Sequence, residues 1–374
     1  MKIVFVNQSA GYLTTDLIRK FHEANYKTYL ITGTNNLENK IPFCEIEKIP
    51  RYDNRTILTR ILTWIWSSII IYFKILFKYR KCKIVFYSNP PTNVFIHLVL
   101  KKLNFGYVIF DIYPDLIESY SEKSRFFKSI YKIWEFSNKM AYAKAKFVIY
   151  ISEGMRVPLA KYVDESKLKY VGLWSNLTNE LDNFKFSNIR NKFQIEDELL
   201  LVYSGNLGAQ HPVEKIIDLA KIVGNQKIKF IICGSGSKFN LLEKEIKNAN
   251  LENVKLISRL QQNEYLNLLY SGDFMFVTNS LGAANLSIPS KLFDITAFEK
   301  PILTLCSPNS ELFNIVEKYN IGYNIDISDF HDFEEKFILG DLRKTQINFQ
   351  PNIKKFNLEH QCHYQLDKLF KIIN

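Results

Sequence analysis

Short apolar runs recur along this chain, and each is followed by a loop of small or polar residues and then by a helical segment. In the first half, the apolar runs lie at 1–7, 28–32, 83–88, 107–113 and 147–152. After a break they resume at 199–208, 228–236, 254–259 and 274–278. Strands that alternate with helices at this spacing indicate parallel pairing, because a parallel pair needs a crossover connection. The pattern therefore predicts an α/β fold.

The length of 374 residues is enough for two domains with separate cores. The periodicity fails around 170–186, which we interpret as the interdomain linker. We predict an N-terminal domain at 1–175 and a C-terminal domain at 176–355. A C-terminal helix within 356–374 is expected to pack back on the N-terminal domain.

The formal net charge is +11, and the basic residues are concentrated in the first half. A basic half is typical of proteins that bind nucleic acid, an anionic membrane or a phosphorylated substrate. The five cysteines are widely spaced and odd in number, which favours reduced thiols in a cytosolic protein. Because the chain begins on a predicted strand and no cleavage site follows a long apolar region, we expect no signal peptide.

One segment, residues 56–83, combines an apolar stretch with basic ends. It has no charge from 61 to 73, which is shorter than the roughly 20 residues that a bilayer span needs. Trp64, Trp66 and Tyr72 are aromatics favoured at a membrane interface. We predict a helix that lies on, or dips into, an anionic membrane surface rather than a nucleic-acid site. The alternative is a core helix whose basic ends are solvated.

Residues 285–301 have the features of an anion-binding helix start. Small residues precede Pro289, which suits a first helical turn, and Ser290 offers a hydroxyl there. Free amide groups at a helix start attract phosphate, and Lys291 adds a full charge. Ser290, Lys291 and Asp294 share one arc of the helix, so phosphate and ribose contacts are both possible. The alternative is an ordinary exposed helix start.

Glycines follow two strands of the second half, at Gly205 and at Gly234. Gly234 and Gly236 lack the third glycine of the dinucleotide fingerprint, which disfavours nicotinamide or flavin binding. Loops at the carboxyl ends of parallel strands converge, so we expect these glycines to meet the 285–297 element at one edge of a sheet.

Two carboxylates follow a strand of the first half, at Asp111 and Asp115. Either can act as a general base for a hydroxyl, or cap the next helix or turn. His360, Cys362 and His363 lie in a polar terminal helix without a second ligand cluster, so we predict no metal site. His211 is either a polar residue at a helix start or a phosphate or sugar contact.

Three motifs together resemble the glycosyltransferases of the GT-B fold, close to family 4 and its bacterial capsule, O-antigen and exopolysaccharide enzymes. The motifs lie at 203–208, at 288–292 continuing to 300–303, and at 111–115. The resemblance implies two Rossmann-like domains that face each other across a cleft. It also implies a nucleotide-sugar co-substrate in the C-terminal domain, an acceptor in the N-terminal domain, and transfer with retention and without a metal.

The resemblance also implies roles for individual residues. In the donor site it implies contacts from Gly205, Asn206, Gly234, Arg259, Ser290, Lys291 and Asp294. Within this set, Lys291 would bind the diphosphate and Asp294 the ribose. Gly11, Tyr12 and Asn89 would contact the acceptor, and Asp111, Asp115 and Lys291 are the candidate catalytic residues.

The chain departs from the family pattern at two places. Leu286 stands where the family has the first glutamate of a paired motif, and Gln210 and His211 replace an arginine and a lysine. These departures leave the donor sugar open and increase the expected importance of Lys291 and Arg259.

Together these features predict a retaining glycosyltransferase that moves a UDP-linked sugar, of hexosyl or N-acetylhexosaminyl type, to a polyprenyl-linked saccharide. It would act in surface polysaccharide assembly, as a cytoplasmic protein peripheral to the inner face of the plasma membrane. The alternative is a catalytically reduced GT-B protein that binds a nucleotide sugar or acts as a scaffold.

Overall fold

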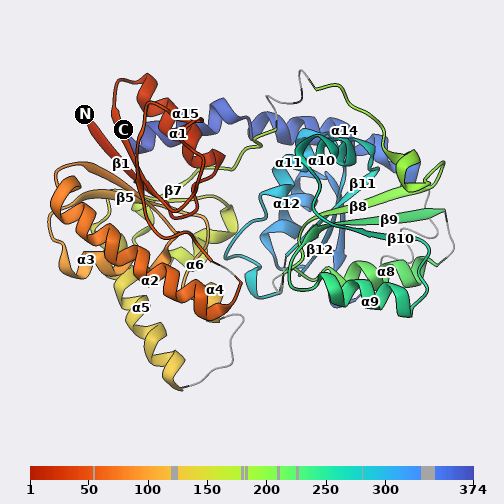
Figure 1. Ribbon diagram of the computed structural model, residues 1–374, viewed down its shortest axis with the longest axis horizontal. Coiled ribbons are helices and arrows are strands. Elements are labelled where there is room, and N and C mark those ends of the chain that lie inside the picture. Colours follow the sequence, from red (N-terminus) through yellow and green to blue (C-terminus); the bar gives the residue numbers. More distant parts are fainter. Residues whose placement is uncertain are drawn as a thin grey trace. The chain divides into compact units, whose positions relative to one another are not determined.

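The computed structural model of the protein describes residues 1–53, 55–118, 125–177, 181, 184–208, 211–224, 227–279, 281–329 and 342–374. Two compact units are present (Figure 1). Unit 1 contains Met1–Leu173, Asn285–Ser287 and Cys362–Asn374, and unit 2 contains Trp174–Ala284 and Ile288–Gln361. The main division lies between Leu173 and Trp174, next to the boundary that we expected at 175.

Unit 1 is built on a parallel sheet with the strand order β3-β2-β1-β4-β5-β6-β7. The strands are β1 (Lys2–Val6), β2 (Lys27–Thr32), β3 (Glu45–Lys48), β4 (Lys83–Tyr87), β5 (Asn104–Ile109), β6 (Val148–Tyr150) and β7 (Leu168–Tyr170). The inner strands are buried along almost their whole length, as parallel strands covered on both faces require. The edge strands β3 and β7 were not predicted, because they are partly exposed and carry no apolar run.

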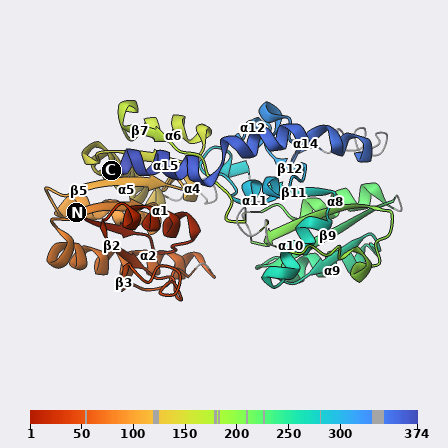
Figure 2. The same ribbon diagram turned by 90° about the horizontal axis from the view of Figure 1, so that it is seen from above.

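The helices of unit 1 include one that is distant in sequence. They are α1 (Tyr12–Glu23), α2 (Ile57–Lys74), α3 (Ile96–Val99), α4 (Asp115–Glu118), α5 (Arg125–Lys144), α6 (Arg156–Ala160) and α15 (Cys362–Ile373). α15 lies beside α1 (Figure 2), where Lys20 pairs with Asp367 at 2.6 Å and the rings of Phe21 and Phe370 are 4.6 Å apart. The C-terminal end of the chain therefore forms part of the first unit's structure.

Unit 2 repeats the architecture with the strand order β10-β9-β8-β11-β12-β13, again all parallel. Its strands are β8 (Leu199–Asn206), β9 (Ile228–Ser235), β10 (Val254–Ile257), β11 (Phe274–Thr278), β12 (Ile302–Cys306) and β13 (Gly322–Asp326). Its helices are α8 (Glu214–Val223), α9 (Phe239–Asn248), α10 (Gln262–Ser271), α11 (Lys291–Ala297), α12 (Glu311–Tyr319) and α14 (Leu342–Glu359). The single terminal helix that we expected is thus two helices, α14 in unit 2 and α15 in unit 1.

Each sheet has one place where the strand order reverses, between β1 and β4 in unit 1 and between β8 and β11 in unit 2. At such a switch point the crossovers leave in opposite directions, so a crevice opens at the carboxyl ends of the two strands. Gln8 and Ser88 follow the strands in unit 1, and Asn206 and Thr278 end them in unit 2. The prediction of two parallel α/β domains is confirmed, and these two edges are where ligand sites are expected.

Candidate active site

In unit 2 the switch point is lined by glycines that allow a close approach of backbone to side chains. Gly205 and Gly234 are register partners on β8 and β9, and a Cβ on Gly234 would overlap the carbonyl oxygen of Gly205. A Cβ on Gly205 would lie 2.7 Å from the Tyr203 hydroxyl and 3.3 Å from Cε of Lys291. Glycine at both positions therefore leaves room beside Lys291, as the predicted convergence requires.

Lys291 is a half-buried cation at this edge. It is the first residue of α11, and its Nζ lies 5.4 Å from the centroid of the Tyr265 ring. Within the described part of the chain, no hydrogen bond or ion pair reaches this ammonium group. Burial lowers the pKa of Lys291, and the nearby charge of Asp294 partly opposes that effect. A partly desolvated cation without an ion-pair partner is suited to an anionic ligand.

A second cation and a neutral imidazole lie close to Lys291. The positive charge of Arg259 also lowers the pKa of Lys291, so the two cations are within electrostatic reach of each other. His211 shares a 3.2 Å hydrogen bond with Thr278 at the end of β11, and burial lowers the pKa of this imidazole. Two positive charges beside a neutral donor or acceptor suit a diphosphate better than a single phosphate.

The start of α11 differs in detail from the prediction. Pro289 was expected in the first turn, but the helix begins at Lys291, and Ser290 occupies the N-cap position without a side-chain cap hydrogen bond. Asp294 accepts a 2.8 Å hydrogen bond from the Ser175 hydroxyl, which fixes the segment that follows unit 1 in sequence. Asp294 therefore has a structural role through Ser175, and its predicted contact with the ribose stays a prediction. Gln210 lies outside the described residues.

In unit 1 the half-buried carboxyl of Asp111 lies next to the switch point. The backbone N–H of Asp111 donates a 3.3 Å hydrogen bond to the hydroxyl of Ser88, which follows β4. The side chain shares a small pocket with tyrosines and prolines: Tyr87, Pro90, Pro91, Tyr107, Tyr113 and Tyr142. Burial raises the pKa of Asp111 to about 6, and the charge of Arg60 partly opposes that rise. A carboxyl group with a pKa close to the working pH is suited to general base catalysis.

Asp115, the other carboxylate of the motif, is fully engaged in packing. It pairs with Lys161 and accepts hydrogen bonds from the hydroxyls of Tyr131 (3.3 Å) and Tyr162 (2.5 Å). These bonds connect α4 to α5 and to the residues after α6. The structure thus distinguishes the two candidate general bases. Asp115 is held by its partners, whereas Asp111 has a raised pKa.

The predicted acceptor residues lie around the β1–β4 edge. Gly11 is the exposed N-cap of α1, where a Cβ would meet no atom within 4 Å, and Tyr12 is the first residue of that helix. The Asn89 carbonyl accepts a 2.8 Å bond from the Gln8 N–H, and Asn89 Oδ1 is buried without a hydrogen-bond partner in the described structure. Asn89 is therefore better placed for a ligand than Gly11.

The helix α2 presents two different faces. Its inner face packs into unit 1 through Trp64, Ser67 and Ile71, each at most 1% exposed. Its outer face is an exposed apolar stripe of Leu58, Leu62, Ile65, Trp66, Ile69, Phe73 and, after α2, Phe77. We define this outer face as the α2 stripe. The neighbouring α3 and α5 add further exposed apolar residues: Leu98, Val99, Ile130, Ile133 and Phe136.

The expectation that this segment is too short to span a bilayer is corrected by the structure. Helix continues without a break from α2 through Ile75–Tyr79, and Leu58–Tyr79 is long and apolar enough to cross a membrane by length and composition. Its inner face, however, is bonded to the unit: the Gln8 side chain donates to the Thr63 carbonyl and to the Ser67 hydroxyl. Of the flanking cations, Lys74 and Lys78 pair with Glu47, and Arg55 pairs with Asp53.

The architecture of the two units and their switch-point sites define a protein of the GT-B fold. Over its full length the chain superposes on WaaG, a glycosyltransferase involved in lipopolysaccharide biosynthesis, with a TM-score of 0.70 and 12% identity, covering 100% of both chains. It also superposes on Anabaena Alr3699/HepE in complex with UDP and glucose, with a TM-score of 0.71 and 13% identity, covering 99% of this chain and 98% of that one.

Sequence comparison adds the class of the second unit. Residues 185–340 match the family model described as glycosyl transferases group 1. The "Probable glycosyltransferase WbjE" of Pseudomonas aeruginosa is 22% identical over 297 residues, which is 76% of this chain and 72% of that protein. Unit 2 therefore carries a glycosyl transferases group 1 domain, and Gly205, His211, Gly234, Arg259 and Lys291 all lie inside the matched segment.

Proposed function

We propose that this protein is a retaining glycosyltransferase of family 4 that transfers a sugar from a UDP-linked donor, of the hexosyl or N-acetylhexosaminyl type, to a polyprenyl-linked saccharide. The observation that carries the proposal is Lys291, a half-buried cation without an ion-pair partner in the described structure, beside Gly205 at the switch point of the group 1 domain. The UDP-bound structural relative supports the choice of nucleotide.

The donor half of the mechanism follows from the charges in unit 2. Lys291 and Arg259 would bind the diphosphate, and their charge would stabilise the negative charge that builds up on it as the glycosidic bond breaks. Asp294, whose carboxylate accepts a hydrogen bond from the Ser175 hydroxyl, would also accept hydrogen bonds from the ribose hydroxyls. Because Lys291 and Arg259 already supply two positive charges, we expect transfer without a metal ion.

The acceptor half of the mechanism depends on Asp111. With a pKa of about 6, this carboxyl is ionised near neutral pH but remains basic enough to accept a proton from an attacking hydroxyl. The departing diphosphate is the alternative proton acceptor. Either route forms the new bond from the acceptor oxygen to the anomeric carbon and leaves the free nucleotide.

The donor assignment is tested by nucleotide-dependent thermal stabilisation of the whole protein. UDP at a hundredfold excess over its Kd is expected to raise the melting temperature by roughly 5 °C, because a ligand that binds only the folded state stabilises it. GDP, ADP and CMP serve as the comparison set, and EDTA is expected to leave the UDP effect unchanged. Stabilisation by none of the four nucleotides would refute the donor site.

The second candidate function is a nucleotide-sugar-binding or scaffolding subunit without transfer activity. Leu286, at the place of the family's first glutamate, is the feature that favours it. One assay distinguishes the transferase from the scaffold: the protein and a panel of UDP-sugars are incubated with bacterial membranes. Transfer of any sugar supports the enzyme, and NMR of the product's anomeric proton tests retention. Binding without turnover supports the scaffold.

We propose that the α2 stripe attaches the protein to the inner face of the plasma membrane, which would make it a peripheral cytoplasmic protein. An apolar stripe of this length is unusual on a soluble surface, and exposed cations such as Arg80 and Lys81 follow it. Because the opposite face of α2 is packed in unit 1, a helix lying on the surface fits better than one crossing the bilayer. The location would place the active site near lipid-linked acceptors.

The double substitution of Trp66 and Phe77 by serine is expected to weaken binding to mixed phosphatidylcholine and phosphatidylglycerol vesicles by roughly 10- to 100-fold. The reason is that two large apolar side chains are no longer transferred from water into the membrane. Vesicle co-sedimentation measures the effect. The matched control is L241S with L358S, which removes two similarly exposed side chains from unit 2. Equal vesicle binding by the two double variants would refute membrane attachment through the α2 stripe.

A further inference from the structure

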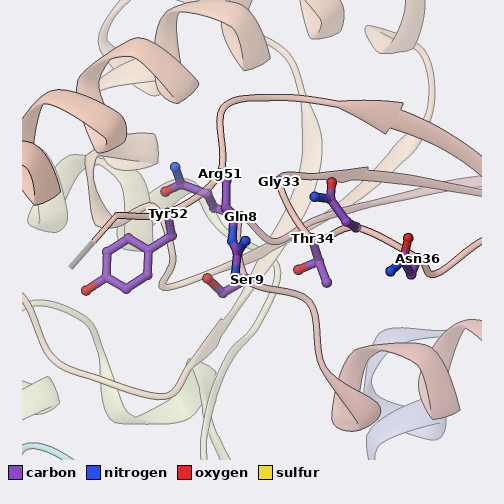
Figure 3. A pocket seen from close by; sticks show the side chains of 8 residues that line it. Gln8, Ser9, Gly33, Thr34, Asn36, Arg51 and Tyr52 are labelled. Carbon is purple, nitrogen blue, oxygen red and sulfur yellow. The ribbon is translucent and has the colours of Figure 1, made fainter. Parts of the chain in front are cut away.

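A polar pocket of about 500 Å³ lies in unit 1, at the carboxyl edge of its sheet (Figure 3). Its lining comes from three segments: Gln8 and Ser9 after β1, the four residues from Gly33 to Asn36 after β2, and Arg51 and Tyr52 after β3. None of the residues predicted to bind the acceptor lines it. Its volume is within the range of small-molecule sites, about 300–1,000 Å³.

The chemistry of the lining is specific. Amides and hydroxyls predominate, through Gln8, Ser9, Thr34, Asn35 and Asn36, and Arg51 contributes the single charge. Arg51 is exposed and has no ion pair within the described residues. Neutral donors and acceptors beside one unpaired cation match a sugar that carries a negative group.

The pocket has a rigid floor. Gln8 is only 1% exposed, and its amide nitrogen donates to the Pro50 carbonyl (3.0 Å) and to the Ser67 hydroxyl (2.7 Å). Its Oε1 has no hydrogen-bond partner in the described structure, which is rare for a buried side-chain oxygen. Gly33 lets the two walls meet, because a Cβ there would lie 2.5 Å from the Pro50 oxygen and 2.8 Å from Cα of Arg51.

Contacts of Gln8 and Tyr52 connect the pocket to the rest of unit 1. The bond from Gln8 to Ser67 ties the floor to the inner face of α2, whose outer face is the α2 stripe. The ring of Tyr52 stacks parallel to that of Trp64 at 6.0 Å, and the Tyr52 hydroxyl lies within electrostatic reach of Asp111. A ligand in this pocket would therefore lie against residues that contact the α2 helix and that are within electrostatic reach of the proposed base.

We infer that this pocket holds the saccharide of the acceptor, with an anionic group of that acceptor against Arg51. The inference rests on the proposed function and identifies a part of the acceptor site that the predicted residues Gly11, Tyr12 and Asn89 do not include. The anionic group has two chemical sources, the phosphoryl group of the lipid linkage or the carboxylate of an acidic sugar. The bond between the pocket floor and α2 favours the phosphoryl group.

The test is a calorimetric titration of the full chain with N-acetylglucosamine 1-phosphate, with glucuronic acid and with N-acetylglucosamine. R51Q is expected to weaken binding of the phosphorylated sugar about 10- to 100-fold, because it removes a hydrogen bond to a charged group. R51K, which keeps the charge, is expected to lose less. T34V is expected to weaken binding of all three sugars, because it removes one hydroxyl without changing the shape. R19Q, on an exposed arginine of α1, is the control.

The outcomes distinguish a phosphoryl group from a sugar carboxylate, and they distinguish failure of the pocket assignment from failure of the proposed donor function. Arg51-dependent binding of glucuronic acid alone supports the pocket and assigns the anionic group to a sugar carboxylate. Unchanged binding of every probe by both R51Q and T34V overturns the pocket. Stabilisation by UDP depends on unit 2 and is measured on the same variants. If UDP stabilises R51Q and T34V normally while both variants also bind every sugar probe normally, the pocket assignment fails and the proposed donor function stands.

Discussion

Replacing Lys291 with alanine is expected to lower the turnover number about a hundredfold and to leave the fold intact. The lysine meets the charge that builds on the departing diphosphate, and loss of one such donor costs on the order of a hundredfold in rate. Because burial already lowers the pKa of this ammonium group, its removal relieves a desolvation cost, and the melting temperature should not fall. Steady-state kinetics and thermal denaturation on the same preparation measure both effects.

Unit 2 provides a matched control for this variant. Lys300 is also half-buried, its pKa is also lowered by burial, and its Nζ lies 5.5 Å from the Tyr270 ring centroid. It differs from Lys291 in lying outside the glycine-lined edge. K300A is therefore expected to keep its turnover and its stabilisation by UDP. If K291A and K300A retain activity equally, Lys291 is not part of the donor site.

Replacing Asp111 with asparagine is expected to lower kcat/KM by about 10²- to 10⁴-fold, the usual contribution of a general base. The wild-type rate should fall as the pH drops through about 6, where this carboxyl becomes protonated, and the remaining activity of D111N should lack that step. A pH–rate profile of both proteins measures it. D115N distinguishes the two carboxylates, because a larger rate loss in D115N than in D111N would assign the base to Asp115.

The same carboxyl also affects stability, with a sign set by its raised pKa. The folded state keeps this proton up to about pH 6, and the unfolded chain releases it near the ordinary value of 3.8. The free energy of unfolding therefore falls as the pH rises between these values, by on the order of 3 kcal/mol. D111N avoids that loss, so it should melt at a higher temperature than wild type near neutral pH and at a similar one below pH 4. A lower melting temperature near neutral pH would contradict the burial cost.

The apolar runs alone were enough to predict the two-domain α/β architecture. A parallel strand buried on both faces needs an almost continuous apolar sequence, so β1, β4, β8 and β11 are visible in the chain. The glycines at 205 and 234 were visible for a related reason, because each follows such a run. The edge strands β3 and β7 were not predicted, since an exposed edge permits charged residues such as Glu45 and Lys48.

The chemistry of the candidate sites depended on contacts between residues distant in sequence. Spacing treated Asp111 and Asp115 as equivalent, but Lys161 and two tyrosine hydroxyls engage Asp115, whereas burial among tyrosines raises the pKa of Asp111. The pocket at Arg51 was not predicted, because its three segments come together only when β1, β2 and β3 pair. The sequence by itself determined which strands form the buried centre of each sheet, since a strand covered on both faces must be apolar along its whole length. Only the tertiary structure decided which polar groups are left without partners, because a side chain's partners come from other elements.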